Sequence, residues 1–294
     1  MGFYAKVFIL ALIQGAAELL PVSSSAHVIL AEKLMGLDPS RPDMVFLLVM
    51  LHTGTMFAAI VYFWSSWKAL LFPPPEHAGS GRRFMLMILL ATAATGFLGL
   101  GLQHVIERVV LEGFLQHPKG EIEQLFRSLP LIGSALTAAG LLILLSSRFS
   151  SQEGKRSAEV SPRLALVIGL VQGLCLPFRG FSRSGATISA GLMGGLPRKF
   201  AEEFSFALAV VLTPPLIARE GWKLWKLLHA PEGANAQLLE LLLPGLIGMA
   251  LSFLSGLAAL RLLSAVLARG RWAWFGIYCL AFAAMVFIAA WQGV

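Results

Sequence analysis

Long apolar runs without a charged residue constrain this chain more than any other feature of its sequence. A helix rises 1.5 Å per residue, so about 20 residues cross the roughly 30 Å hydrocarbon layer of a bilayer. Runs of about this length contain no Asp, Glu, Lys or Arg at Met44–Trp64, Phe84–Gln103, Leu129–Ser147, Leu241–Leu260 and Trp272–Trp291. The chain is therefore predicted to be an all-α membrane protein that crosses the bilayer several times.

Another apolar run, Phe204–Ala218, is shorter and contains Pro214-Pro215. Prolines are tolerated in membrane helices that pack on neighbouring helices, and the flanking residues can lengthen this run to a full span. Six transmembrane helices are therefore predicted. The composition agrees, because 57% of the 294 residues are hydrophobic and only 13% are charged, which excludes a pair of soluble domains.

Further apolar runs are too short to cross a bilayer, and they form two pairs, each joined by a short polar turn. The pairs are Val7–Leu20 with Ala26–Met35, and Leu164–Phe178 with Ser184–Leu196. Non-helical backbone at membrane depth needs protein or water to satisfy it, so each pair is predicted to be a re-entrant helix–turn–helix. A signal peptide is the alternative for the first run, since Lys6 precedes it, but Gln14 and Glu18 interrupt that run and no convincing cleavage site follows.

The order of these elements repeats, which predicts a single membrane domain over residues 1–294 made of two halves, 1–147 and 162–294. Each half holds one re-entrant pair and three spans, and the segment Leu12–Gly15 (LIQG) recurs as Leu170–Gly173 (LVQG). Because each half crosses three times, the second half is predicted to be inverted relative to the first. Inverted repeats with broken helices are common in secondary transporters, so a transporter is one functional alternative.

Charged residues predict the orientation of the chain and exclude some partners. The net charge is +7, but Lys and Arg lie mostly in short gaps between apolar runs, which argues against a nucleic-acid-binding face. Basic residues concentrate in the gaps on one side, including the connector Arg148–Arg163, and this side is assigned to the cytoplasm. Both termini and the turn Gln14–His27 are then predicted to lie outside. Cys175 and Cys279 lie within apolar runs and predict neither a disulfide framework nor a cysteine metal site.

The first polar turn carries residues that are costly in a membrane. Glu18 follows Gln14 by four residues, so the two share one face of an apolar helix, where a carboxylate is expensive unless it lines a functional cavity. The alternative is a protonated Glu18 that bridges two helices. Ser23, Ser24 and Ser25 follow at the start of the next helix, where hydroxyl and N–H groups favour an anion, although serines there can also be plain helix caps.

Two histidines lie within the predicted membrane helices. His27 is three residues after Ser24, on one face of the same predicted helix. Its imidazole can reach a serine hydroxyl or a bound substrate, or it can bond a neighbouring helix. His52, in an otherwise uncharged span, is interpreted as a packing residue or a polar contact between helices.

The second polar turn, Arg179–Thr187, reads RGFSRSGAT. Arg183 is very costly within a membrane, and its planar group of five donors matches the oxygens of phosphate or carboxylate. Ser182, Ser184 and Thr187 add hydroxyls around it. If the halves are inverted, the two turns face each other and set a carboxylate, a histidine and hydroxyls opposite an arginine. This combination suits phosphoryl transfer, in which positioning and charge neutralisation supply most of the catalysis.

Three motifs in order resemble the undecaprenyl-diphosphate phosphatase family, the integral-membrane type linked to bacitracin resistance. They are QGAAELLPVSSSAH (14–27), GFSRSGATIS (180–189) and EEFSFALAV (202–210), and the likeness in hydrophobic layout covers essentially the whole chain. The resemblance implies an enzyme that removes the terminal phosphate of undecaprenyl diphosphate, a polyprenyl lipid, and yields the monophosphate carrier for cell-wall synthesis. It also implies an active site at the outer face of the bacterial inner membrane.

The resemblance also assigns site residues. It places an essential glutamate at Glu18, a glutamate or glutamine at Gln14, the serine pair and histidine at Ser23, Ser24 and His27, and the arginine motif at Ser182, Arg183, Ser184 and Thr187. Ser25 is expected to join the substrate-binding groups. This chain departs from the family at Arg179, where proline is common, and at Ala26, where glycine is common. Because Gln14 does not ionise, Glu18 is the only carboxylate of its turn, which weakens a mechanism with two carboxylates on one metal ion.

A mechanism is expected from these roles. Arg183 and the N–H groups of the turns bind the diphosphate, and Ser24 attacks the terminal phosphorus with His27 as its base, or His27 activates a water molecule. Glu18 either holds a divalent cation such as Mg²⁺ or Ca²⁺, or orients His27. A lipid-phosphate flippase is the alternative of another class, and it would use the same arginine without a nucleophile.

Overall fold

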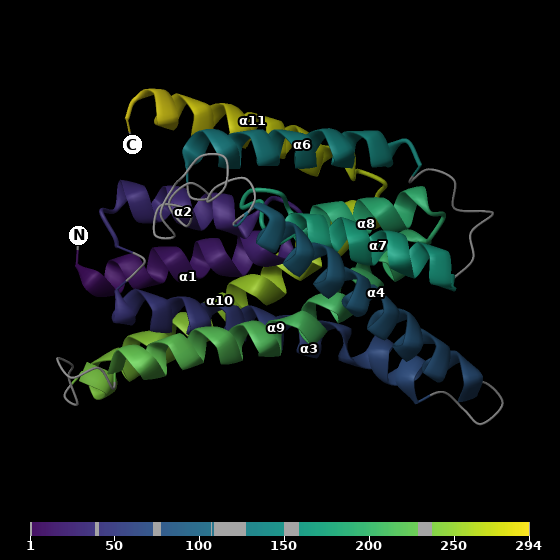
Figure 1. Cartoon of the computed structure of the whole chain (residues 1–294), viewed down its shortest axis with the longest axis horizontal. Helices are drawn as coiled ribbons and strands as arrows, with labels where there is room; N and C mark the ends of the chain where they lie inside the picture. Colours follow the sequence, from purple (N-terminus) through teal and green to yellow (C-terminus); the bar gives the residue numbers. More distant parts are fainter. Residues whose placement is uncertain are drawn as a thin grey trace.

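The computed structural model describes residues 2–38, 41–72, 78–106, 108, 128–149, 159–228 and 237–293, and the regular elements in these ranges are helices. They are α1 (Phe3–Leu19), α2 (Ser24–Leu34), α3 (Pro42–Leu71), α4 (Ala78–Val105), α6 (Leu129–Ser147), α7 (Pro162–Cys175), α8 (Arg183–Met193), α9 (Arg198–Leu228), α10 (Gln237–Ala268) and α11 (Ala273–Trp291). Figure 1 shows how they pack side by side. The prediction of an all-α protein is confirmed.

Six of the described helices are long and apolar enough to cross a bilayer, namely α3, α4, α6, α9, α10 and α11. They correspond to the six apolar runs that the sequence analysis identifies as spans, except that Trp272 lies just before α11. α9 continues as a helix through Pro214-Pro215, and α3 packs along it, as expected where neighbouring helices support the prolines. The prediction of a multi-pass membrane protein with six spans is confirmed.

The first pair of short helices breaks at a constrained turn. α1 ends at Leu19, and Ser23 caps α2 by accepting a hydrogen bond from the backbone N–H of Ala26 at 3.4 Å. Ser23 has a φ of 69°, a left-handed conformation that is uncommon for residues other than glycine. Such conformations persist where the surrounding structure holds them, and they cluster at functional sites.

The second pair breaks in a similar way. α7 ends at Cys175, and Ser182 caps α8 by accepting a hydrogen bond from the backbone N–H of Gly185 at 3.2 Å. Between these helices Gly180 has a φ of 102°, which L side chains rarely adopt, and a Cβ there would lie 2.5 Å from the carbonyl oxygen of Ile132. Whether the two pairs enter the bilayer as re-entrant hairpins stays a prediction.

The recurring LIQG and LVQG segments have matching packing roles. Gly15 faces α10, where a Cβ would lie 2.5 Å from the carbonyl oxygen of Ser252. Gly173 faces α4, where a Cβ would lie 2.9 Å from the carbonyl oxygen of Thr95. Glycine therefore lets α1 approach α10, and α7 approach α4, at close range. Matching contacts of this kind agree with an inverted repeat, and the repeat stays a prediction.

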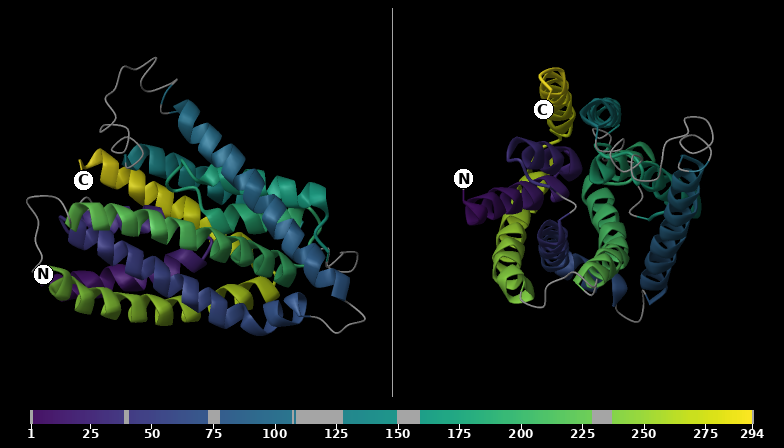
Figure 2. Two further views of the ribbon diagram at one scale, coloured as in Figure 1. Left: turned by 60° about the horizontal axis from the view of Figure 1, so that its bottom comes forward. Right: turned by 60° about the vertical axis from the view of Figure 1, so that its left-hand side comes forward.

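The broken helices lie in the middle of the molecule. Figure 1 shows α1, α2, α7 and α8 between the α6–α11 pair and the group formed by α3, α9 and α10. α8 contacts both α6 and α9, and α1 contacts α10 and α3. The chain begins and ends at the same end of the bundle (Figures 1 and 2). The polar residues Ser23, Ser182 and Ser184 are buried in this interior, so hydroxyls of both turns are covered by protein.

Candidate active site

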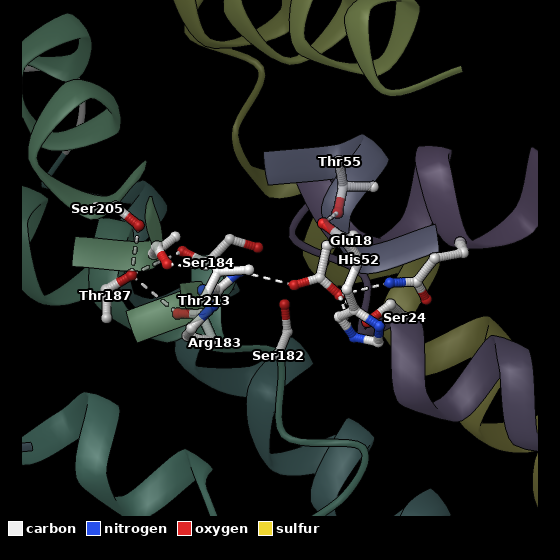
Figure 3. Close-up of polar contacts among 12 residues, drawn as sticks. Glu18, Ser24, His52, Thr55, Ser182, Arg183, Ser184, Thr187, Ser205 and Thr213 are labelled. Atoms are coloured by element: carbon white, nitrogen blue, oxygen red, sulfur yellow. Dashed lines mark hydrogen bonds and ion pairs between the residues drawn. The ribbon is translucent and has the colours of Figure 1, made fainter. Parts of the chain in front are cut away.

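The two polar turns meet at an ion pair between Glu18 and Arg183. Nη2 of Arg183 donates a hydrogen bond to Oε1 of Glu18 at 2.8 Å. Glu18 lies in the last turn of α1 and Arg183 is the first residue of α8, so the contact joins the two halves of the chain (Figure 3). A carboxylate of the first turn thus faces the arginine of the second, as the sequence predicts.

Other contacts hold the two turns together beside this pair. The backbone N–H of Gly180 donates to Oγ of Ser25 at 3.1 Å, and Oγ of Ser184 donates to the carbonyl oxygen of Leu20 at 3.2 Å. Ser25 also lies 3.2 Å from Oγ of Ser23. These bonds give the serines a structural role, and their expected contacts with substrate stay predictions.

The second carboxylate oxygen of Glu18 lies close to three further polar side chains. Ser24 donates to Oε2 at 2.6 Å, and the amide of Gln14, one turn earlier on α1, donates to it at 3.2 Å. Nε2 of His52, on α3, lies 3.9 Å from the same oxygen. A serine hydroxyl bonded to a carboxylate at short range already shares its proton with a base, which is the geometry of an activated nucleophile.

The surroundings of Glu18 favour its ionised form. This residue lies on α1, outside the six candidate spans. Burial raises the pKa of the Glu18 carboxyl, but Arg183, His52, Ser24 and Gln14 together lower the pKa by more, so that it lies below its ordinary value. Glu18 is therefore a carboxylate that accepts hydrogen bonds, and the alternative of a protonated residue bridging two helices is disfavoured.

His27 bonds its own turn and a neighbouring helix. Its Nδ1 donates to the carbonyl oxygen of Ser23, its Nε2 accepts from the hydroxyl of Tyr278 on α11, and both distances are 2.8 Å. The ring also stacks on Phe282, with centroids 3.8 Å apart and planes inclined by 1°. Of the contacts that the sequence allows for His27, the structure therefore shows the bond to a neighbouring helix, α11, and the flat imidazole fits against the aromatic face of that helix.

His52 lies beside Glu18, so of the two interpretations of this residue the polar contact between helices is the one that the structure shows. It lies on α3, and its Nε2 faces Glu18, while Figure 3 also draws it beside Ser24. An ionisable side chain inside a membrane span is a functional candidate by default, and this signal could have identified His52 from the sequence. The two residues lie on different helices, so no local motif contains both.

The hydroxyls behind Arg183 fix the start of α8. Ser182 is buried and accepts a bond from the N–H of Gly185. Thr187 is buried, donates to the carbonyl oxygen of Arg183 at 2.9 Å, and lies 2.6 Å from Oγ of Ser205 on α9 (Figure 3). These contacts position the arginine, and direct contacts of Ser182 and Thr187 with substrate stay predictions. Ser205 lies in the EEFSFALAV motif, and the contact with Thr187 brings this motif next to the second turn.

The amino-terminal ends of two helices converge on Glu18. Ser24 and Arg183 are the first residues of α2 and α8, and both donate hydrogen bonds to its carboxylate. Helix N-termini have free N–H groups and a partial positive charge, so they favour anions. An arginine, two helix N-termini, a hydroxyl and a carboxylate base together suit the binding and attack of a phosphate group.

The protein side chains provide few ligands for the expected divalent cation. Both oxygens of Glu18 already accept hydrogen bonds, from Arg183 and from Ser24. Among the residues that the structure describes, no group of three or more Asp, Glu, His or Cys could hold a metal ion. A cation at this site would therefore need oxygens of the substrate and water, which Mg²⁺ commonly uses in phosphate-binding sites.

Known proteins share this sequence over nearly its whole length. A model of the family described as bacitracin resistance protein BacA matches residues 7–285, a range that includes both polar turns. Undecaprenyl-diphosphatase 2 of Acinetobacter baylyi is 58% identical over 286 residues, which cover 97% of each chain. Undecaprenyl-diphosphatase 2 of Burkholderia thailandensis is 35% identical over 293 residues, covering 95% of this chain and 94% of the relative. Undecaprenyl-diphosphatase of Desulfatibacillum aliphaticivorans is 32% identical over 302 residues, covering 97% and 98%.

Proposed function

Since this chain belongs to the family of bacitracin resistance protein BacA, we infer that it is an undecaprenyl-diphosphatase. It removes the terminal phosphate of undecaprenyl diphosphate and yields undecaprenyl phosphate, the lipid carrier for cell-wall synthesis. The substrate is a polyprenyl diphosphate lipid, and a protein with six candidate spans meets such a lipid in the membrane.

The arrangement around Glu18 carries the proposed mechanism. One carboxylate oxygen bonds the hydroxyl of Ser24 at 2.6 Å, and the other bonds Arg183 at 2.8 Å. Glu18, the base, thus holds both the nucleophile Ser24 and the phosphate-binding cation Arg183. Arg183 has five N–H donors, of which the bond to Glu18 uses one, so the guanidinium can bind phosphate oxygens without losing its position.

In the proposed first step, Oγ of Ser24 forms a bond to the terminal phosphorus. The bond from this phosphorus to the bridging oxygen breaks, and undecaprenyl phosphate leaves with the electron pair. The proton of Ser24 passes to Oε2 of Glu18, which already accepts its hydrogen bond. Arg183 and the N-termini of α2 and α8 neutralise the charge on the transferred phosphoryl group.

Glu18 takes the role that the sequence analysis gives to His27. The carboxylate is 2.6 Å from the serine hydroxyl, whereas both ring nitrogens of His27 are bonded to Ser23 and Tyr278. A direct contribution of His27 to catalysis would require its imidazole to leave these partners. Its catalytic role remains the prediction that family resemblance supports.

A divalent cation, Mg²⁺ or Ca²⁺, is proposed to accompany the diphosphate. When bound to the phosphate oxygens it would neutralise part of their charge. The protein groups that would lie next to it are Glu18 and the hydroxyl of Ser24. Phosphate release measured with and without a chelator tests this proposal, and a rate that the chelator leaves unchanged would contradict it.

The location of the site is proposed from charge distribution. The positive-inside rule places the basic gaps in the cytoplasm, so the turns around Glu18 and Arg183 open toward the outer face of the bacterial inner membrane, with both termini outside. This side suits an enzyme that returns a lipid carrier after use in wall synthesis.

Substitution of the nucleophile and its base tests the mechanism. Ser24→Ala and Glu18→Gln are each expected to lower phosphate release by purified protein at least about 100-fold, with binding of undecaprenyl diphosphate largely kept by Ser24→Ala. The double variant is expected to be little slower than either single variant, because residues that act as a unit are strongly non-additive. Ser134→Ala is the matched control, since this exposed serine on α6 donates its hydrogen bond to the carbonyl oxygen of Pro130 on its own helix.

Two outcomes would contradict the mechanism. A Ser24→Ala protein that keeps most of its rate would show that water attacks the phosphorus directly. If Ser24→Ala and Glu18→Gln left phosphate release unchanged but disturbed movement of the lipid across vesicles, the flippase alternative would stand instead. Undecaprenyl phosphate and a soluble diphosphate serve as comparison substrates in both assays.

A further inference from the structure

His52 is held in a defined direction by its own helix. Its Nδ1 lies 2.8 Å from the carbonyl oxygen of Leu48, one turn earlier on α3. A carbonyl oxygen only accepts hydrogen bonds, so Nδ1 carries a hydrogen, and Nε2 is the ring nitrogen that can take up a proton when His52 acts as a base. This nitrogen faces Oε2 of Glu18 (Figure 3). The bond to Leu48 thus fixes both the tautomer and the orientation of the imidazole.

The distance between His52 and Glu18 suits a shared water molecule. Nε2 lies 3.9 Å from Oε2, which is too far for a direct hydrogen bond. Two hydrogen bonds of about 2.8 Å to one water oxygen would span this distance at an angle of roughly 90°, close to the angle between the hydrogens of water. The two side chains are 30% and 17% exposed, so water can reach both acceptors.

Such a water would also lie near the nucleophile. Oγ of Ser24 is 2.6 Å from the same oxygen of Glu18, so a molecule bonded to that oxygen is a neighbour of any group attached to Ser24. A phosphoryl group on Ser24 would therefore sit next to this water. A water molecule there would be close enough to attack this phosphorus in the second half of a two-step hydrolysis.

We propose that His52 is the general base that activates water to hydrolyse a phosphoserine at Ser24; this rests on the proposed function, in which Ser24 is the nucleophile. The water oxygen forms a bond to phosphorus, and the bond from phosphorus to Oγ breaks. One proton of the water passes to Nε2 of His52. Oγ recovers the proton that Glu18 took in the first step, phosphate leaves, and His52 then releases its proton to solvent.

Two bases are needed because each step moves a different proton. Glu18 holds the proton of Ser24 after the first step and must return it to Oγ when the phosphoserine breaks, so it is not available for the proton of water. His27 is bonded to Ser23 and Tyr278. His52 is the imidazole that the structure places beside Glu18, with Nε2 directed at the site.

Accumulation of the intermediate tests this role. The full-length protein is purified and given undecaprenyl diphosphate with radioactive phosphorus in its terminal phosphate. In His52→Gln and His52→Ala, steady-state phosphate release is expected to fall at least about 100-fold. The first turnover should still release one equivalent of undecaprenyl phosphate and leave label on Ser24, and added imidazole should restore phosphate release in His52→Ala. A residue with a purely structural role would produce neither the labelled serine nor the rescue.

A neighbouring substitution provides the control. Thr53→Ala removes a hydroxyl that bonds the carbonyl oxygen of Val49 on the same helix, and it should keep both steps at the rate of the unmodified protein. The inference is overturned if a His52 variant releases phosphate at the unmodified rate. It is also overturned if a slow His52 variant carries no label on Ser24, since His52 would then act in the first step. Failure of the proposed function is distinct, because Ser24→Ala would then remain active while His52 is intact.

Discussion

Glu18 and Arg183 form an ion pair at 2.8 Å although 165 positions separate them in the chain. Each residue lies at a break between two short helices, so the pair ties the end of α1 to the beginning of α8. The other oxygen of Glu18, Oε2, accepts a hydrogen bond from Ser24. The same carboxylate therefore links the two helices and is placed to act as a base. Loss of either partner should therefore affect the fold and the reaction together.

Replacement of Arg183 tests its geometry separately from its charge. Arg183→Lys is expected to lower kcat/KM at least about 100-fold, because an ammonium group keeps the charge but lacks the planar fork that binds two phosphate oxygens. Arg183→Ala should abolish turnover and also lower thermal stability, since it leaves the half-buried Glu18 without its cation. Steady-state phosphate release and thermal unfolding in detergent measure both effects. Near-normal activity of the lysine variant would show that Arg183 supplies only charge.

Apolar runs alone predict the membrane helices of this protein. Five long uncharged runs and the shorter run around Pro214-Pro215 correspond to the six candidate spans, because the thickness of a bilayer fixes the length of a spanning helix. The two polar turns are also visible in the sequence, since Glu18 and Arg183 are costly in a membrane and therefore indicate function. Their contact follows from the predicted arrangement of the halves.

Contacts between distant helices are the part of the site that the sequence does not reveal. Tyr278 bonds His27 across 251 positions, and no local spacing rule relates α2 to α11. His52 meets Glu18 only because α3 packs against α1. The environment of each histidine depends on helix packing, and for this reason the sequence assigns His27 to the reaction while the structure places His52 beside the carboxylate.

The hydroxyls of Thr187 and Ser205 form a buried hydrogen bond, so substitutions of the two residues should have non-additive effects on the free energy of unfolding. Thr187→Val removes the partner of Ser205 and leaves its hydroxyl buried, which is expected to cost about 1–3 kcal/mol. Adding Ser205→Ala removes that unsatisfied group, so the double variant should be more stable than Thr187→Val. Thermal unfolding of the three variants measures the coupling. If the two substitutions were simply additive, the short contact between these hydroxyls would contribute nothing to the fold.

Close packing of α1 on α10 should depend on Gly15. A Cβ at this position would lie 2.5 Å from the carbonyl oxygen of Ser252 and 2.7 Å from Cβ of Ser255, so Gly15→Ala is expected to push the helices apart and to lower both stability and activity. Gly96→Ala on α4 is the matched control. Nothing lies within 4 Å of a Cβ there, and removing a helical glycine should stabilise the protein by about 0.5–1 kcal/mol. Unfolding temperatures of the two variants should therefore move in opposite directions.

The orientation of the chain decides which side of the membrane the active site serves. Arg41, before α3, and Arg269, after α10, are both exposed and lie at ends of candidate spans that the charge distribution assigns to opposite sides. In a protein with Cys175 and Cys279 replaced and activity retained, a cysteine at Arg41 is expected to react with an impermeant thiol reagent in intact cells. A cysteine at Arg269 should react only after the cells are permeabilised.

The two labelling results distinguish orientation from span number. The opposite pattern, with Arg269 labelled and Arg41 protected, would keep the six spans but place the termini in the cytoplasm. The proposed outward-facing site would then be wrong, because the turns at Glu18 and Arg183 are assigned to a side by the same rule. Equal labelling of both positions in intact cells would mean that α3 and α10 do not both cross as assigned. Retained phosphate release by each variant shows that the labelled protein has the native arrangement.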